Sequence, residues 1–596
     1  MLVLFASLSF ARDTPEPVGA WRDTVDWARA EDETVRWLAD YLAVDTVAPP
    51  GNEMDGVRYL TAILDAEGIG HTVIDHGDNR GSLIARLPAT RPVEGAAPLC
   101  LLSHIDVVPS ERENWTVEPL SGEIRDGQVY GRGALDMKGM GIVELGAMVH
   151  LKRLGVPLER DLVLLAVADE EVHGLGMKAL VNDHWSEIGC SHMINEGGLG
   201  IRDALLEGQT LHAISVAEKG TLWTRMIASG NAGHGSTVTE EEAPARLLEA
   251  MALLERKYRP KYRIDPAFYE LFDHAGRQRG GFTGSVLRSP FLVRLLVKSK
   301  LKRIPTTRAA MSNTLHLTGM GGASSVNVVP SEVWAQYDSR LMPGTSPEEL
   351  LAELQHLTRK LEHIRWEVVD QEPANGSPWD DPFYDAIEHY AAEGRPEAAA
   401  GPILSVGFTD SIFARPLGVH AYGYVPFEVS AEEAETMHGH DERVSIDNLR
   451  EGTRRMLSIL LDFAGTDAGP TPELTEALAA WSAVEPASDA SGLGAELAAR
   501  LAVPAKGDAK AVLDRYTRAR LDTWLRSAPL PSPEQLGEGG LNAVLTLAGM
   551  GDPAFTKRVV EPLGCEVEHP ELRSLQAQAG LDVCGNTAEP TPHPPE

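Results

Sequence analysis

Three apolar runs that lead directly into polar residues constrain the fold of this chain most strongly. They span residues 98–108 (PLCLLSHIDVV), 161–168 (DLVLLAVA) and 192–195 (HMIN). From about residue 30 to 216, such runs alternate with amphipathic helical stretches, which is the pattern of βαβ units and a mainly parallel sheet. Open parallel sheets bind ligands beyond the carboxyl ends of their strands, so polar side chains far apart in sequence can converge there. We therefore predict an α/β fold with its chemistry at that edge of the sheet.

The chain has 596 residues, which is too many for one hydrophobic core. The pattern of apolar residues changes after residue 216, where alternating and helix-like segments predict an inserted α+β lid or dimerisation domain. Residues at about 259–307 form an additional segment within this lid. The α/β pattern then returns. We predict a catalytic domain in two parts (30–216 and 370–465), the lid between them (217–369), and a mostly helical extension with a disordered tail (468–596).

The charge balance argues against nucleic acid as a partner. Asp and Glu outnumber Lys and Arg by 87 to 54, which gives a formal net charge of −33. Such a surface repels nucleic acid. Hydrophobic residues (43%) and charged residues (24%) have the proportions of an ordinary globular protein, so we expect a soluble chain with a packed core.

The N-terminal segment 1–11 resembles a truncated signal peptide. Its apolar run is too short to span a bilayer, and no Lys or Arg precedes it. We expect no transmembrane segment and a periplasmic or secreted protein, with a cytoplasmic location as the alternative. Near the C-terminus, Cys565 and Cys584 could form a disulfide or stay as two unpaired thiols.

Polar clusters occur at the ends of the predicted strands and in the glycine-rich segments. In Ser103-His104-Ile105-Asp106, strand alternation directs His104 and Asp106 to the same side. Asp136 precedes a predicted helix at 139–154, where it could bind a ligand or serve only as the helix N-cap. Three consecutive acids at 169–171 would repel one another at a buried site without a cation.

Two further clusters complete a donor set that fits a metal centre. They are NEGG at 195–198 and HGHDER at 438–443. Together, two histidines, two carboxylates and a central aspartate suit two divalent ions about 3.5–4 Å apart. The mixture of nitrogen and oxygen donors favours zinc, with cobalt or manganese as substitutes.

The order of the motifs adds a resemblance to a known family. It resembles the two-zinc metallopeptidases, metallopeptidase family twenty, which include aminoacylase, carboxypeptidase G, succinyl-diaminopimelate desuccinylase and carboxypeptidase S. The resemblance runs from about residue 30 to 465. It rests on SHIDVVP, GRGALDMKGM, ADEEVHG, INEGG, EKG…GHGS, NVVPSE…DSRLMPG, TDS and MHGHDERV.

The resemblance implies a role for each of the matching residues. His104, Asp136 and Glu196 would hold one zinc ion, and Asp136, Glu171 and His438 the other, so that Asp136 bridges the two. The family pattern places the metal ligand on His438 and not on His440. Glu170 would take a proton from the catalytic water and return it to the leaving nitrogen. Asp106 would orient His104.

The resemblance also implies a homodimer. His234 is similar to a family histidine that reaches the active site of a neighbouring subunit and stabilises an oxyanion there. Asn327 and Arg340 match lid positions that contact the substrate, and Arg340 suits a bidentate grip on its carboxylate. Thr409 and Asp410 match a loop beside the substrate. For all four, a purely structural role is the alternative.

The expected reaction is hydrolysis of an amide bond next to a free carboxylate, in N-acyl amino acids or small peptides. EKGTLWTRMIASGNAGHGS and the long insert before MSNTLHLTGMGG look most similar to the carboxypeptidase S and N-acyl-amino-acid hydrolase branch, which favours apolar substrates. The alternatives are a desuccinylase or deacetylase of a biosynthetic intermediate and a catalytically silent relative that only binds.

Overall fold

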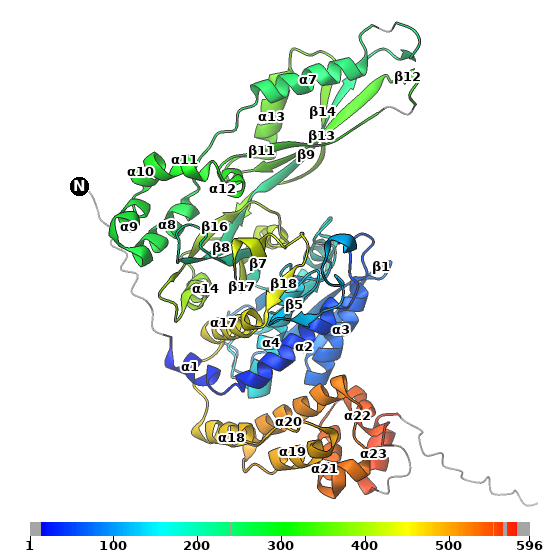
Figure 1. Cartoon of the computed structure of the whole chain (residues 1–596), viewed down its shortest axis with the longest axis vertical. Coiled ribbons are helices and arrows are strands. Elements are labelled where there is room, and N and C mark those ends of the chain that lie inside the picture. The colour runs from blue at the N-terminus through cyan, green and yellow to red at the C-terminus, as the bar shows by residue number, and fades with distance from the viewer. Residues whose placement is uncertain (1–13, 239, 323–324, 552, 564–568, 581–596) are drawn as a thin grey trace, which may run out of the picture. The chain divides into compact units, whose positions relative to one another are not determined.

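The computed structural model describes residues 14–238, 240–322, 325–551, 553–563 and 569–580 (Figure 1). The chain divides into two compact units, Met1–Gly176 with Met437–Glu596, and Met177–Thr436. The predicted signal peptide at 1–11, Cys565 and Cys584 lie outside the described residues, and so does the end of the predicted tail.

In the first unit, four strands pair in the order β1 (Gly70–Gly77), β2 (Arg80–Leu87), β6 (Leu162–Val167) and β3 (Leu99–His104). The pair β3–β6 is parallel, and its register runs from Leu99↔Leu162 to His104↔Val167. The two strands therefore end side by side, and the polar residues that follow them emerge at one edge. A small sheet joins β4 (Ile124–Arg125), β5 (Gln128–Tyr130) and β18 (Arg443–Ser445).

Helices cover this sheet and bury its apolar residues. α4 (Lys138–Leu154) packs on β3 and against α2 (Trp27–Leu42) and α17 (Ile446–Ala464). Nearly all of its residues are buried, among them the charged residues Lys138, Glu144 and Arg153. It ends at Gly155, whose left-handed φ of 68° favours glycine. The remaining elements of this part are α1 (Glu16–Arg22), α3 (Glu53–Glu67) and η1 (Arg112–Asn114).

The C-terminal extension is helical, as predicted. Its helices are α18 (Pro472–Ser482), α19 (Ala490–Leu501), α20 (Gly507–Ser527), α21 (Pro533–Gly549), α22 (Pro553–Val560) and α23 (Pro570–Gln578). Helices α19 to α23 share an apolar core that includes Leu497, Leu521, Leu547 and Phe555, and α18 packs on α20. Helix α20 also packs on α3 and α4, so the extension and the N-terminal helices belong to the same unit.

The second unit has its own parallel pairs. β7 (His192–Arg202) is parallel to β17 (His420–Val429), and β8 (Thr210–Glu218) is parallel to β16 (Ala398–Ser405). β15 (Asn375–Gly376) extends this group on β8. Helices α14 (Pro382–Ala392), α15 (Ser411–Ala414), η4 (Arg415–Leu417) and α16 (Ala431–Ala434) contact these strands. The chain enters this unit through α5 (Leu175–Ala179), η2 (Leu180–His184) and α6 (Trp185–Ile188).

A separate four-stranded antiparallel sheet occupies the segment predicted as the lid. Its order is β11 (Thr314–Gly321), β13 (Glu332–Leu341), β9 (Gly220–Ser229) and β14 (Ile364–Glu372). Helices α7 (Ala243–Lys257) and α13 (Pro347–Thr358) pack on this sheet (Figure 1). A two-stranded pair joins β10 (Gly233–His234) to β12 (Val328–Val329).

The insert at 259–307, for which the sequence had no clean periodicity, consists of short helices. They are α8 (Pro266–Arg279), α9 (Gly281–Leu287), α10 (Pro290–Leu292), η3 (Val293–Val297), α11 (Lys298–Leu301) and α12 (Pro305–Ala309). Helix α8 packs on β16, and Phe272 and Leu287 share a core with Leu211 of β8. The insert therefore covers the β8–β16 pair.

Both units combine parallel strand pairs with helices, so the predicted α/β class with a helical C-terminal part is confirmed. None of the helices in the described parts of the chain has both the length and the apolar character of a membrane span.

Candidate active site

His104 lies at the last position of β3, with its side chain almost completely buried. Its Nδ1 lies 2.9 Å from the backbone carbonyl oxygen of Asp106. This hydrogen bond leaves Nε2 directed away from the strand, toward the carboxylate of Asp136 at 3.1 Å. The resemblance implied that Asp106 orients His104. The backbone carbonyl of Asp106 makes the short contact with Nδ1, whereas the Asp106 carboxylate lies 3.7 Å from Nδ1.

The Asp106 carboxylate has a different set of partners. It is fully buried and accepts hydrogen bonds from the backbone N–H groups of Glu170 (3.1 Å) and Glu171 (3.0 Å). Burial raises the pKa of Asp106, and these two donors oppose that rise. Asp106 therefore fixes the turn that follows β6 and sets the positions of both glutamates.

The third acid of this turn has a structural partner. Asp169 has a left-handed φ of 67° and accepts a hydrogen bond at 2.6 Å from Arg80 of β2. Of the three consecutive acids, Asp169 is thus neutralised by an arginine, while Glu170 and Glu171 follow it at the strand end.

Asp136 lies between two histidines. Its Oδ1 is 3.1 Å from Nε2 of His104, and its Oδ2 is 3.0 Å from Nε2 of His438. Nε2 of His438 also lies 3.2 Å from Oε1 of Glu171. Asp136 does not cap α4, whose N-cap residue is Met137 with no side-chain hydrogen bond. The structure therefore brings four of the predicted ligands together: His104, Asp136, Glu171 and His438.

The charges of this cluster reinforce one another. Burial opposes ionisation of Asp136, but the imidazoles of His104 and His438 outweigh it and lower the pKa of Asp136. The carboxylates of Asp136 and Glu171 raise the pKa of His438 to about 10. Ligand atoms of His104, Asp136 and Glu171 all lie within 4.8 Å of one another, which is close enough to hold a metal ion.

Glu442 is a positioning residue that the sequence did not reveal. Its buried carboxylate accepts hydrogen bonds from the backbone N–H groups of Gly133 (2.9 Å), Leu135 (2.8 Å) and Asp136 (3.0 Å). It also pairs with the buried guanidinium of Arg132 at 2.7 Å. The sequence offered one signal for this pair: Arg132 and Glu442 carry opposite charges and lie in two glycine-containing motifs. No spacing rule, however, connects residues 310 positions apart.

Glu196 and the loop at 409–411 belong to the second unit. Glu196 follows Asn195 on β7, and the Asn195 amide donates a hydrogen bond to the Ser411 hydroxyl at 3.1 Å. Thr409 is buried and donates to Glu218 from its backbone N–H and its hydroxyl. Asp410 is also buried, at the start of α15. This loop therefore supports the strand segment that carries Glu196.

His234 and Asn327 lie together at one end of the lid sheet. His234 pairs in register with Val328, and the backbone N–H of Gly235 donates to the carbonyl oxygen of Asn327 at 2.8 Å. Both side chains are exposed, and His234 Nδ1 contacts the hydroxyl of Ser236 at 2.8 Å.

Arg340 lies at the opposite end of the same sheet. It follows Glu332 by eight residues on β13, a separation of roughly 26 Å. Its guanidinium is half-buried and pairs with Asp338 at 3.0 Å. The structure therefore separates Arg340 from His234 and Asn327 within one chain.

Residues 100–462, well over half of the chain, match the model of peptidase family M20/M25/M40. The chain belongs to this family. The match covers the end of β3, the turn after β6 and α17, so it includes the whole cluster described above. Enzymes of the M20 family depend on metal, typically zinc, and the predicted family resemblance is confirmed.

The curated relatives of this M20 chain include a synthase/hydrolase of N-fatty-acyl amino acids, an aminoacylase and a carboxypeptidase S-like protein. The human N-fatty-acyl-amino acid synthase/hydrolase PM20D1 is 27% identical over 429 residues, covering 70% of this chain and 83% of the relative. Pig aminoacylase-1 is 25% identical over 448 residues, covering 74% and 98%. The probable carboxypeptidase S-like 2 of Dictyostelium discoideum is 26% identical, covering 60% and 70%. The chain is accordingly a hydrolase of the peptidase and aminoacylase type that acts on amide bonds.

Solved structures share the fold. The M20 metallo-carboxypeptidase Sso-CP2 of Sulfolobus solfataricus superposes with a TM-score of 0.54 at 17% identity, covering 72% of this chain and 99% of that one. Human carnosine dipeptidase 1 gives 0.51 at 16% identity, covering 76% and 99%.

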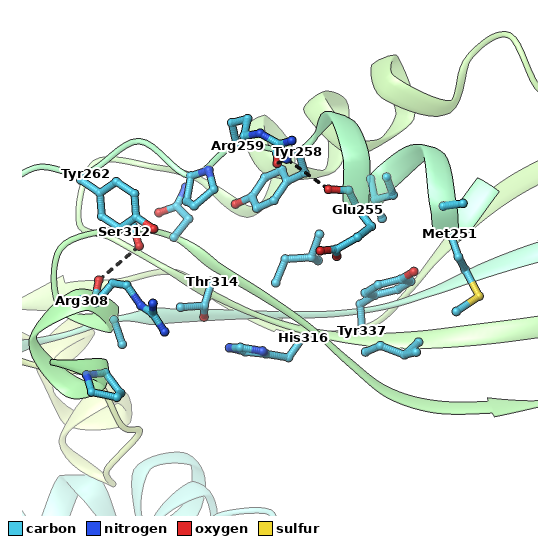
Figure 2. A pocket seen from close by; sticks show the side chains of 18 of the residues that line it. Met251, Glu255, Tyr258, Arg259, Tyr262, Arg308, Ser312, Thr314, His316 and Tyr337 are labelled. Carbon is cyan, nitrogen blue, oxygen red and sulfur yellow. Dashed lines mark hydrogen bonds between the residues drawn. The ribbon is translucent and has the colours of Figure 1, made fainter. Parts of the chain in front are cut away.

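Two pockets lie in the second unit of this M20 protein, and none of the predicted ligands is among the residues that line them. One, of about 780 Å³, lies between α7 and β11, and Tyr258, Arg308, His316 and Tyr337 line it (Figure 2). None of the predicted site residues lines it. The other, of about 230 Å³, is apolar and lies under the insert helices; its walls include Leu199, Ala213, Phe268, Leu301 and Ile403.

Proposed function

We propose that the chain is a two-zinc amidohydrolase that cleaves N-acyl amino acids with apolar acyl groups, or small peptides, at the amide bond next to a free carboxylate. The observation that carries the proposal is the arrangement of Asp136, whose two carboxylate oxygens face two different histidines. With one oxygen beside each histidine, Asp136 would be able to hold two metal ions together with His104 and His438.

The residues at this site fit zinc. His104 and His438 supply nitrogen and Asp136 and Glu171 supply oxygen, a donor set without thiolates that zinc accepts, as cobalt and manganese also do. The family pattern assigns Glu196 as the fifth ligand. Bound zinc supplies a Lewis acid that polarises the scissile carbonyl and lowers the pKa of a water molecule.

Glu170 acts as the general base in this proposal. The hydrogen bond from its backbone to Asp106 fixes the start of its side chain, and the residue is 9% exposed. In this position the Glu170 carboxylate takes a proton from the attacking water and delivers it to the leaving nitrogen as the C–N bond breaks. Asp106 orients Glu170 and Glu171 through their backbone N–H groups, and orients His104 through its own backbone carbonyl.

We propose that the enzyme is a homodimer in which each lid serves both active sites. One chain cannot bring His234 and Arg340 to the same amino-acid carboxylate and amide, because roughly 26 Å separates the two ends of β13. Arg340 would bind the substrate carboxylate, while His234 and Asn327 of the other subunit would contact the oxyanion and the substrate. The exposure of His234 and Asn327 in the single chain supports this division.

The apolar pocket under the insert supports an apolar acyl group. Leu199 of its wall follows Glu196 by three residues on β7, about 10 Å along the strand. We propose that an acyl chain extending from an amide near Glu196 enters this pocket. A succinyl group carries a charge that such walls would desolvate, so the pocket disfavours the desuccinylase alternative. For Thr409 and Asp410, the hydrogen bonds of the loop favour support of the site over direct substrate contact.

We further propose a periplasmic or secreted location. The two cysteines that the structure describes, Cys100 and Cys190, are both disulfide-bonded. Disulfides persist in oxidising compartments and are rare in the cytosol. The sequence of the mature N-terminus tests this location, because cleavage near residue 11 indicates export and a start at Met1 contradicts it.

The proposed mechanism is tested with Glu170→Gln. Hydrolysis is measured on N-acyl amino acids and dipeptides, and bound zinc is measured on the same samples. We expect the variant to keep all of its zinc and to lose about 10²–10⁴-fold in kcat. Full turnover of the variant would exclude Glu170 as the base, and zinc-loaded wild type without turnover would favour the silent binding relative.

A further inference from the structure

Two histidines lie side by side at the amino-terminal ends of a parallel strand pair in the second unit. His192 is the first residue of β7 and His420 the first residue of β17, and the two are register partners. Side chains of register partners point to the same face of a sheet. Their rings stand edge to face with centroids 5.3 Å apart. Glu196 lies farther along β7, so this histidine pair is separate from the proposed catalytic ligands.

A carboxylate meets both histidines. Oδ2 of Asp381 lies 2.7 Å from Nδ1 of His420 and 3.2 Å from Nε2 of His192. The other oxygen of Asp381 accepts backbone N–H bonds from Phe383 and Tyr384 and so caps α14. Asp381 is therefore held rigidly by the helix, with one oxygen directed at the two imidazoles.

We propose that His192, Asp381 and His420 form a further metal site, which binds a divalent first-row transition ion such as Zn²⁺. Two imidazoles and one carboxylate form a recognised set of ligands for such ions, whereas Mg²⁺ and Ca²⁺ prefer oxygen alone. One ligand atom from each of the three residues lies within 4.8 Å of the others. Around a tetrahedral zinc, neighbouring ligand atoms are about 3.3 Å apart. The two observed separations from Oδ2, 3.2 and 2.7 Å, are within about 0.6 Å of that value.

The surroundings of the three ligands favour binding. Nδ1 of His192 contacts the hydroxyl of Ser191 at 2.8 Å, which orients the ring and presents Nε2 to the shared centre. The His420 side chain is 38% exposed, so an ion can enter from solvent and keep water at its open positions. The side chains of His192 and Asp381 are 17% and 7% exposed and form the inner side of the site.

The competing interpretation is a hydrogen-bonded His–Asp–His cluster that only fastens α14 to the starts of two strands. Metal stoichiometry distinguishes the two interpretations. The variants are H420A and H192A, each of which removes one ligand. The matched control is H184A, because His184 of the same unit also pairs with a carboxylate, Glu187 at 2.6 Å, but forms no metal-binding group of three with other residues that the structure describes.

The full-length protein and each variant are dialysed against buffered Zn²⁺, and bound zinc is counted per chain. We expect H420A and H192A to hold one zinc ion fewer than wild type, and H184A to hold as many as wild type. Amide hydrolysis by H420A should stay within about twofold of wild type, since no catalytic group changes, and retained activity also verifies that the variant is folded.

In the D136A variant, zinc bound by His192, Asp381 and His420 can be counted without zinc at the proposed catalytic centre. D136A should retain one zinc ion per chain, and D136A/H420A should retain none. Zn²⁺ should raise the melting temperature of D136A but not of the double variant. Equal zinc content in wild type and H420A, or in D136A and D136A/H420A, would overturn the proposal and leave the hydrogen-bonded cluster. A zinc content unaffected by D136A would instead count against the proposed catalytic centre only.

Discussion

Arg132 and Glu442 form a buried ion pair, with Nη1 of the arginine 2.7 Å from Oε2 of the glutamate. The same glutamate receives three backbone N–H groups from the loop that ends at Asp136. Glu442 follows His438 by four residues, so one buried carboxylate connects the segments that carry two of the proposed metal ligands. The geometry of the metal centre therefore depends on a pair of residues that do not belong to it.

Replacing Glu442 by alanine should damage both stability and metal binding. The change leaves the buried Arg132 guanidinium without its carboxylate partner, which should cost about 3–5 kcal/mol in unfolding free energy. Zinc affinity should fall about 10–100-fold, because the Asp136 loop loses its anchor. Chemical unfolding and zinc titration measure the two effects. Glu118→Ala, which removes an exposed partner of Arg112, is the control and should change stability by less than about 1 kcal/mol. Unaltered zinc affinity in E442A would contradict the positioning role.

Filling the apolar pocket should change substrate preference. Ala213→Phe places a ring in the pocket and should lower kcat/KM for long-chain N-acyl amino acids about tenfold or more, which corresponds to ~1.4 kcal/mol. N-acetyl substrates should be affected much less, because an acetyl group does not reach the pocket. Ala252→Phe, the same change in the other pocket, is the control. An equal loss on both substrate types would mean that the pocket does not hold the acyl chain.

At the contact with the extension, replacing Arg153 should lower the free energy of unfolding more than replacing any other charged residue. Its buried guanidinium, near the end of α4, pairs with Glu33 and Glu67, and its backbone carbonyl accepts a hydrogen bond from Arg515 of α20. Arg153→Met leaves two buried carboxylates and should reduce the unfolding free energy by about 3–5 kcal/mol. Arg58→Met, at an exposed ion pair with Asp55, should reduce it by less than about 1 kcal/mol. Similar losses in the two variants, measured by urea unfolding, would contradict this account.

His274 should make stability dependent on pH in the alkaline range. Burial lowers its pKa, but the carboxylates of Glu270 and Glu388 outweigh burial and raise it to about 10, above the ordinary value of 6.5. A group whose pKa rises on folding stabilises the protein fully below the unfolded-state value and loses this effect as pH rises through the folded-state value. The stability difference between wild type and His274→Gln should therefore shrink by more than about 1 kcal/mol from pH 6 to pH 10. A difference that is constant over this range would show that His274 is not charged in the folded protein.

Helices and strands could be predicted where the apolar residues kept one periodicity over many positions. The apolar run 161–168 contains β6, and the helix predicted at 139–154 corresponds to α4. The helices of the insert were missed because Pro266, Gly280, Pro290 and Pro305 divide them into pieces too short for a helical period to emerge. In α21, Gly537 has a φ of 66° and interrupts the helical pattern.

The site was predictable only to the extent that its residues lie at strand ends or within motifs. His104 ends β3 and Glu171 follows β6, and the parallel register of these strands brings the two ends together, so the proximity of the two residues could be expected. The partners that position them could not. Asp106 binds the backbone of Glu170 and Glu171, and Glu442 binds the Asp136 loop, through contacts that only the tertiary fold creates.

The zinc content of D136A tests the central claim most directly. If Asp136 bridges two metal ions, the loss of its carboxylate removes a ligand from both, and the variant should hold two zinc ions fewer per chain than wild type and have no measurable amide hydrolysis. A loss of one ion would mean that Asp136 serves a single metal. No loss of zinc, with hydrolysis retained, would contradict the metal centre proposed for His104, Asp136, Glu171, Glu196 and His438.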